Sequence, residues 1–247
     1  YNPKTDAIWD FIPATGVVPN TETSGSDGHI QGAIFGNTFF RVIGINNYTQ
    51  TKVEVYDIPS RVQRATYIIN KQLANGGGIF GARPQISYDP NTNSLWFATI
   101  YDGSLGELDL DTGVFADFPI PQEAGVAVGA TDVKVDSMRN KLYVSIAKFR
   151  PVWQGASTPF VDGSLYEIDL ATKQIARQVT LQVYPWSVAI LPTSTGTYVA
   201  VTNSATVSGN NVSVPSTVSI VNVSNFAEVA RLQTQKQPTA MAVEFKD

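Results

Sequence analysis

Short stretches in which apolar and polar residues alternate run along most of the chain, and one such stretch recurs. Asp102–Gly113 reads DGSLGELDLDTG and Asp162–Lys173 reads DGSLYEIDLATK, with looser copies at Thr51–Ile58 and Ser216–Val223. The tail of the same pattern fits Tyr1–Thr5. Alternation with a period of two residues is typical of a β-strand that has one apolar side.

An Asp or Asn recurs in each copy, at Asn2, Asp57, Asp109, Asp169 and Asn222, in steps of 55, 52, 60 and 53 residues. A further alternating stretch follows each of them. We expect the recurring side chain to open a turn, because Asp and Asn can bond their own backbone two residues on. A period of about 50 residues built from strands favours a β-propeller. The alternative is a β-sandwich with chance similarity between its strands.

A propeller blade has four strands, which we denote a to d from the axis outward. The sequence predicts four full sets. The predicted ranges, from a to d, are 30–35, 38–45, 52–58 and 64–70; 84–89, 95–100, 104–110 and 114–120; 131–136, 141–147, 163–170 and 174–181; and 186–191, 197–203, 217–223 and 228–233.

Residues 1–12 are expected to supply one c–d pair and 238–245 one further a strand. These pieces do not complete one blade, because strand b, which lies between a and c, is missing. Without it, backbone N–H and C=O groups of a and c would stay unpaired. Five blades would need a missing b strand, and six would need strands beyond both ends. The expectation is therefore an all-β fold, one β-propeller domain over 1–247 that is incomplete at both ends. It has four full blades plus partial first and last blades, and is six-bladed when intact.

Composition narrows the classes of function. The net charge is −4 without a basic stripe, so nucleic acid is not an expected partner. No apolar run approaches the roughly 18 residues of a membrane helix. The absence of cysteine excludes disulfides and thiolate metal sites. Sequons predict glycosylation at Asn47 and Asn211, and a third at Asn222 lies within a predicted strand. The sequons favour a secreted glycoprotein.

Four short motifs give the chain a layout that resembles a known family. The first is Tyr1-Asn-Pro-Lys-Thr5, which precedes a predicted strand. The second and third each precede or open the innermost strand of a blade, and they are Ser24-Gly-Ser-Asp-Gly28 and Ala82-Arg-Pro84. The fourth is Pro238-Thr-Ala-Met241. This layout resembles the fungal six-bladed propeller family of the major Malassezia allergen and the trichothecene-cluster propeller protein. The resemblance implies links to lipid-like ligands, virulence or secondary metabolism. Similar fungal propellers are thought to include cyclases, among them hetero-Diels–Alder catalysts.

The d–a and b–c loops of a propeller gather around one mouth of the channel, where function is usually found. His29, the single histidine, is a candidate general acid or base. Arg83 could neutralise an anionic or enolic oxygen. The structural alternatives are a backbone hydrogen bond for His29 and a salt bridge between loops for Arg83.

Other polar and aromatic residues of these loops could form a substrate-binding wall for a flat ligand. They are Gln31, Tyr48, Tyr101, Asp132, Arg150, Trp153, Tyr184, Trp186 and Asn203. Packing between blades is the alternative for Trp186. Trp9 and Trp96 alternate within predicted strands and are expected in the core.

Signs of a cofactor are weak, and we expect neither a cofactor nor a metal. A calcium site would need several oxygen ligands, for which Asp27, Asp132 and Asn203 are candidates. The sequence has no nucleophile elbow, phosphate loop or dinucleotide motif.

Three functions fit these features and the resemblance. The first is a cofactor-independent cyclase that acts on an apolar or aromatic small molecule, such as a terpenoid, polyketide or lipid. The second is a non-enzymatic secreted protein that binds lipid or a host partner. The third is a calcium-dependent lactonase.

Overall fold

A computed structural model describes residues 30–46, 49–73, 85–99, 104–149, 160–204, 207–208, 211–212 and 215–234. Within these ranges the chain forms strands and turns, with no helix, and therefore no helix that could cross a membrane. The chain divides into two compact units, Tyr1–Arg83 and Pro84–Asp247.

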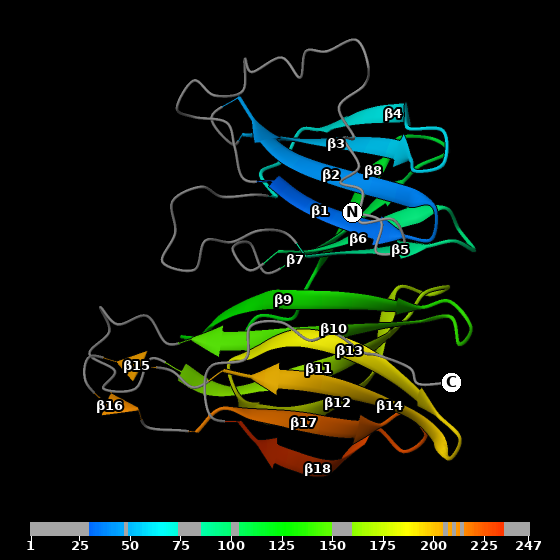
Figure 1. The fold of residues 1–247 in the computed structure, drawn as a ribbon. Coiled ribbons are helices and arrows are strands. Elements are labelled where there is room, and N and C mark those ends of the chain that lie inside the picture. Colours follow the sequence, from blue (N-terminus) through cyan, green and yellow to red (C-terminus); the bar gives the residue numbers. More distant parts are fainter. Residues whose placement is uncertain are drawn as a thin grey trace. The chain divides into compact units, whose positions relative to one another are not determined.

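The first unit contains one four-stranded antiparallel sheet, which we call blade 1 (Figure 1). Its strands are β1 (Ile30–Phe35), β2 (Thr38–Ile45), β3 (Gln50–Asp57) and β4 (Val62–Ile69). They pair in the order in which they follow along the chain. The predicted ranges for β1 and β2 are the observed ones.

The second unit contains three more four-stranded antiparallel sheets, blades 2 to 4, again paired in chain order. Blade 2 comprises β5 (Gln85–Asp89), β6 (Ser94–Thr99), β7 (Ser104–Asp109) and β8 (Phe115–Pro119). Blade 3 comprises β9 (Ala127–Asp136), β10 (Lys141–Phe149), β11 (Phe160–Asp169) and β12 (Gln174–Val183). Blade 4 comprises β13 (Pro185–Thr193), β14 (Gly196–Asn203), β17 (Thr217–Asn222) and β18 (Ala227–Gln233).

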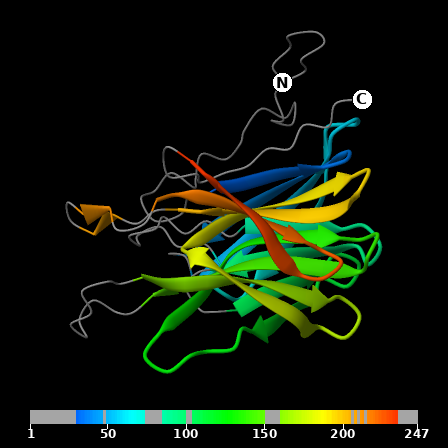
Figure 2. The same ribbon diagram turned by 90° about the horizontal axis from the view of Figure 1, so that it is seen from below.

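A small hairpin of β15 (Val207–Ser208) and β16 (Asn211–Val212) lies in the chain between β14 and β17. Figure 2 shows the strong twist of blade 4, in which the outer strand β18 crosses the direction of the inner strands. The twist is the ordinary consequence of L-residue stereochemistry in strands. All four predicted sets of strands are thus confirmed, and the strands do not form the two stacked sheets of a sandwich.

The recurring Asp or Asn opens the turn after the third strand of every described blade. Asp109 Oδ1 accepts the N–H groups of Asp111 and Thr112 at 2.8 and 3.0 Å. Asp57, Asp169 and Asn222 make the same kind of bond to backbone N–H groups two or three residues on. The turn prediction is confirmed for these four copies, while Asn2 lies outside the described residues.

The fourth residue after each of these turn-opening side chains has a left-handed backbone. These residues are Arg61, Gly113, Lys173 and Phe226, with φ of 58°, 73°, 59° and 52°. A position that requires positive φ favours glycine, yet three blades place a large side chain there. Two of these side chains reach the preceding blade: Lys173 Nζ lies 2.8 Å from Glu107 Oε1, and Phe226 stacks on Tyr143.

Apolar clusters lie between successive blades of the second unit. The cluster between blades 2 and 3 joins residues such as Trp96 and Leu105 to Val133, Leu142 and Ile168. A second cluster joins blade 3 to blade 4. Trp96 is 1% exposed, which confirms its prediction as a core residue. The facing sides of the sheets, rather than a single central core, therefore hold this unit together.

Candidate functional site

The predicted site residues divide into three groups. His29, Arg83, Tyr48, Tyr101, Arg150 and Trp153 lie outside the described residues, as do Asp27 and the sequon Asn47. Gln31 lies half-buried in β1, and Asn211 begins β16. Of the remaining four, Tyr184, Trp186 and Asn203 lie where β13 begins and β14 ends, and Asp132 lies in the middle of β9, bonded to Ser187 and Val188 near the start of β13. The structure thus brings together four residues that are separated by up to about 70 positions in the sequence.

Asp132 bridges the two blades with its carboxylate. Its Oδ1 accepts the N–H of Val133 at 2.8 Å and binds Lys134 Nζ at 2.8 Å. Its Oδ2 accepts the N–H of Val188 at 2.8 Å and the hydroxyl of Ser187 at 3.3 Å. The Asp132 side chain is 3% exposed. These contacts use both oxygens to join β9 to β13, so the group has a structural role whether or not a ligand also reaches it.

Both inner strands are irregular at this end. In β9, Thr131 is the extra residue opposite β10, and its hydroxyl lies 2.7 Å from Ser145 Oγ and donates to the carbonyl of Pro185 at 2.8 Å. In β13, the register shifts between Pro185 and Val188, so that Trp186 and Ser187 lie in the irregular segment. Bulges of this kind redirect side chains and are common beside functional sites.

Tyr184 is the single residue between β12 and β13, and its φ is 54°. A bulky residue with a left-handed backbone costs free energy that the surrounding structure must supply, and such residues cluster at functional sites. Its ring stacks on that of Trp186 with centroids 5.2 Å apart and planes inclined by 28°. Its carbonyl accepts the N–H of Ser204 at 3.0 Å. The Tyr184 ring is buried, whereas Trp186 is only partly covered.

Asn203 ends β14 and is 1% exposed. Its amide nitrogen donates to Ser219 Oγ at 2.8 Å and to Thr217 Oγ1 at 3.1 Å. Thr217 in turn donates to Gln182 Oε1 of blade 3 at 2.5 Å. The Asn203 Oδ1 is buried and has no hydrogen-bond partner in the described part of the chain. An unsatisfied buried acceptor is uncommon and calls for a water or a ligand group.

Close backbone approach explains one glycine of the recurrent Asp-Gly-Ser-Leu motif. A Cβ on Gly163 would lie 2.3 Å from Pro185 Cδ and 2.5 Å from the carbonyl oxygen of Ile146. No side chain fits in that space, so the glycine lets β11 pass beside the start of β13.

Sequence reasoning missed most of the small polar groups around these residues. Thr131, Ser145, Ser187, Thr202 and Thr217 provide hydroxyls at this end of the two blades. Their signal in the sequence is weak, because each is one small polar residue in or next to an apolar strand. No group of three or more His, Cys, Asp or Glu side chains able to hold a metal ion occurs among the residues that the structure describes.

Comparisons with known proteins identify the fold. No protein-family model and no curated protein matches the chain. Among solved structures, the chain is similar to the WD40 domain of coronin from Toxoplasma gondii, with 7% identity over 83% of this chain and 46% of that one, and a TM-score of 0.52. It is also similar to an acylaminoacyl peptidase from Pyrococcus horikoshii, with 8% identity over 90% of this chain and 34% of that one, and a TM-score of 0.52.

A third similar structure is the Dos1 propeller, with 14% identity over 81% of this chain and 45% of that one, and a TM-score of 0.50. The chain spans roughly a third to two thirds of the length of the structures it matches. At these identities the likeness shows the fold alone, and the fold is a β-propeller.

Proposed function

We propose that this propeller binds a small molecule at the shared end of blades 3 and 4, beside Tyr184 and Trp186. The observation that carries the proposal is the left-handed backbone of Tyr184, with φ of 54°, which presents its ring to Trp186 at 5.2 Å. Strain at a bulky residue is retained where the geometry it creates has a use. A stacked aromatic pair with one partly exposed ring suits a flat apolar or aromatic ligand.

Neutral polar groups would orient such a ligand. Ser187 follows Trp186 in the chain and its N–H donates to the Thr202 hydroxyl at 2.9 Å, and the buried Oδ1 of Asn203 offers an acceptor for a ligand N–H or O–H. A mainly apolar wall with a few placed polar groups is the usual composition of a small-molecule site.

The finer proposal is a cofactor-independent cyclase of fungal specialised metabolism, the activity that the family resemblance implies. The described groups at this site favour catalysis by positioning. They are hydroxyls, amides and one carboxylate, and that carboxylate already binds backbone N–H groups. A cyclisation needs reactive ends held together and one or two donors. His29 and Arg83, which lie outside the described residues, remain the candidate donors that the sequence predicts.

Binding can be tested with 2-naphthol as a flat aromatic probe, followed by quenching of tryptophan fluorescence and by calorimetry. Tyr184→Gly removes the tyrosine ring and puts there a glycine, which adopts positive φ without steric cost. Trp186→Leu removes the second ring of the stacked pair. Both variants should weaken binding at least tenfold. Phe115→Leu alters another aromatic pair, with Phe97, and should bind normally. Equal affinity in all four proteins would refute the site.

Catalysis can be tested by the double variant His29→Ala, Arg83→Ala on a panel of linear terpenoid and polyketide precursors. We expect loss of turnover with unchanged circular dichroism and unchanged probe binding. Binding without turnover in the unaltered protein would instead support the secreted lipid-binding or host-binding function. Calcium-dependent hydrolysis of lactones would support the third function.

A further inference from the structure

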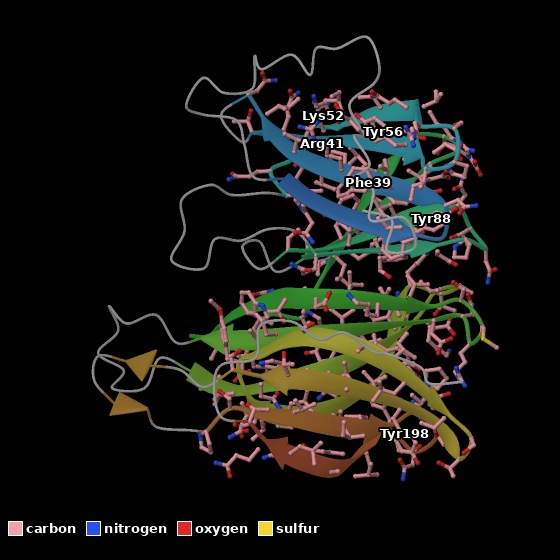
Figure 3. All side chains as sticks on the ribbon, in the orientation of Figure 1. Phe39, Arg41, Lys52, Tyr56, Tyr88 and Tyr198 are labelled. Carbon is pink, nitrogen blue, oxygen red and sulfur yellow. The ribbon has the colours of Figure 1, made fainter. Side chains whose placement is uncertain are left out.

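The side chain of Asn203 points toward blade 3. Alternate residues of a strand face the same side, so Asn203 shares its side of β14 with Val199 and Val201. Both valines pack in the apolar cluster between blades 3 and 4. Tyr198, which Figure 3 labels near the other end of the same strand, faces the opposite side of the sheet. The Asn203 amide therefore lies in the seam between the two blades.

The backbone places Asn203 beside the stacked aromatic pair. Asn203 pairs across the sheet with Pro185, which is the one residue between Tyr184 and Trp186. The Cβ atoms of directly opposed residues in an antiparallel sheet lie about 5 Å apart. The Tyr184 carbonyl accepts the N–H of Ser204, the next residue of the chain, at 3.0 Å. The amide and the aromatic pair thus belong to one small region, within the span of a two-ring ligand.

Two hydroxyl groups fix the orientation of the Asn203 amide. The amide nitrogen donates to Ser219 Oγ at 2.8 Å and to Thr217 Oγ1 at 3.1 Å. The Thr217 hydroxyl is itself the donor to Gln182 Oε1, at 2.5 Å. Burial raises the pKa of Glu228, but hydrogen bonds that include one from the Ser219 hydroxyl lower it overall. Each hydroxyl hydrogen is therefore already used, and toward Asn203 each hydroxyl oxygen can only accept.

The orientation of the amide leaves its oxygen without a donor. A rotated amide would bring Oδ1 against the oxygens of Thr217 and Ser219 with no hydrogen between them, so Oδ1 stays turned away from both. This oxygen is buried and has no hydrogen-bond partner among the residues that the structure describes. A buried acceptor without a donor costs free energy. A donor supplied by another molecule is therefore bound favourably at this point.

We propose that the ligand of this site carries a neutral hydroxyl or N–H group at the edge of a flat ring, and that Asn203 Oδ1 accepts its hydrogen. The inference rests on the proposed binding site beside Tyr184 and Trp186 and narrows the class of ligand. Only a small group at the ring edge fits, because Asn203 is 1% exposed.

The required donor separates the ligand classes that the sequence leaves open. A site built to bond a ligand hydroxyl discriminates strongly against an analogue without it, because the protein group is then left unpaired. A carboxylate has no hydrogen to donate and would meet the negative end of the amide dipole. A phenolic or enolic polyketide therefore fits this acceptor, whereas a hydrocarbon terpenoid or a fatty acid does not.

Four probes with the same two rings test the donor by calorimetry. 2-Naphthol donates a hydrogen bond, whereas naphthalene, 2-methoxynaphthalene and 2-naphthoate do not at neutral pH. We expect 2-naphthol to bind at least about tenfold more tightly than each of the others. Asn203→Leu should abolish this preference, whereas general damage to the site would weaken all probes alike and leave their ratio unchanged. Tyr198→Phe, on the opposite side of the same strand, should keep the preference.

Ser219→Ala gives a second test that does not alter Asn203. It removes one acceptor of the amide nitrogen, so that the amide can rotate, and the preference for 2-naphthol should fall about threefold or more. A preference that neither variant changes would overturn the inference. Equal binding of all four probes, weakened in Trp186→Leu, would also overturn it but would leave the binding site standing. Binding of no probe, or binding that Trp186→Leu does not change, would refute the site and the inference together.

Discussion

The Asp132 carboxylate accepts the backbone N–H of Val188 at 2.8 Å and thereby ties the irregular end of β13 to the neighbouring blade. Asp132→Ala leaves that N–H and the N–H of Val133 without their acceptor. We expect the free energy of unfolding to fall by about 1.5–3 kcal/mol, measured by urea denaturation. Lys134→Ala removes only the partly exposed cation and should cost less than about 1 kcal/mol. Equal losses would show that the backbone bonds contribute little.

A methyl group at position 163 should disturb the same end of the blades. The Cβ of Gly163→Ala would overlap both Pro185 Cδ and the carbonyl oxygen of Ile146. Overpacking of this kind costs about 1–3 kcal/mol, which thermal unfolding would detect. Adding Pro185→Ala to the Gly163→Ala variant should restore part of the lost stability, because it removes the overlap with the proline ring. The restoration should be incomplete, because the overlap with the Ile146 carbonyl oxygen remains. Gly163→Ala with unchanged stability would mean that β11 can move away freely.

At Lys173, favourable contacts of the side chain are opposed by the strain of a left-handed backbone. Its side chain binds Glu107 and lies over Trp96, but its backbone has φ of 59°. Lys173→Ala loses the contacts and keeps the strain, whereas Lys173→Gly loses the contacts and relieves it. We therefore expect the glycine variant to be more stable than the alanine variant by about 1 kcal/mol in urea denaturation. Gly113→Ala, at the corresponding turn, should be destabilised. An alanine variant as stable as the glycine variant would contradict this account.

The lowered pKa of Asp169 should make the stability of the fold depend on pH in the acid range. The hydrogen bond from Lys141 first, and then the N–H of Thr172, lower the pKa of this carboxyl to about 2. Because the pKa is lower in the folded chain than in the unfolded one, near about 3.9, the stabilisation is full above about pH 4. It is lost as the pH falls toward 2.

Asp169→Asn should keep the turn, since Asn222 makes it naturally, and should lose the ion pair. The melting temperature of this variant should fall less between pH 4 and pH 2 than that of the unaltered protein. Asp111→Asn, in the corresponding turn of blade 2, is the control. A parallel decline in all three proteins would exclude Asp169 as a source of the pH dependence.

The fold could be predicted because strand alternation and the recurrent Asp or Asn are local signals. Asp57, Asp109, Asp169 and Asn222 mark the same turn in four blades, and the strands follow from them. The candidate site could be predicted only in part. Tyr184 and Trp186 were recognisable as loop aromatics, but the strain at Tyr184 depends on a connection of one residue between β12 and β13. The link from Thr131 to Pro185 crosses between two sheets, and no local pattern reports it.

The bond between Asp132 and Val188 joins residues 56 positions apart, whereas the four described blades pair their own strands in chain order, with the β15–β16 hairpin inserted between β14 and β17. Contacts between residues near in sequence form early in folding, and distant ones incur a larger loss of chain entropy. We therefore expect each of these sheets to assemble before the seam between blades 3 and 4 closes. A molecule held at that seam would bind only when blades 3 and 4 are joined, and it would therefore slow their separation.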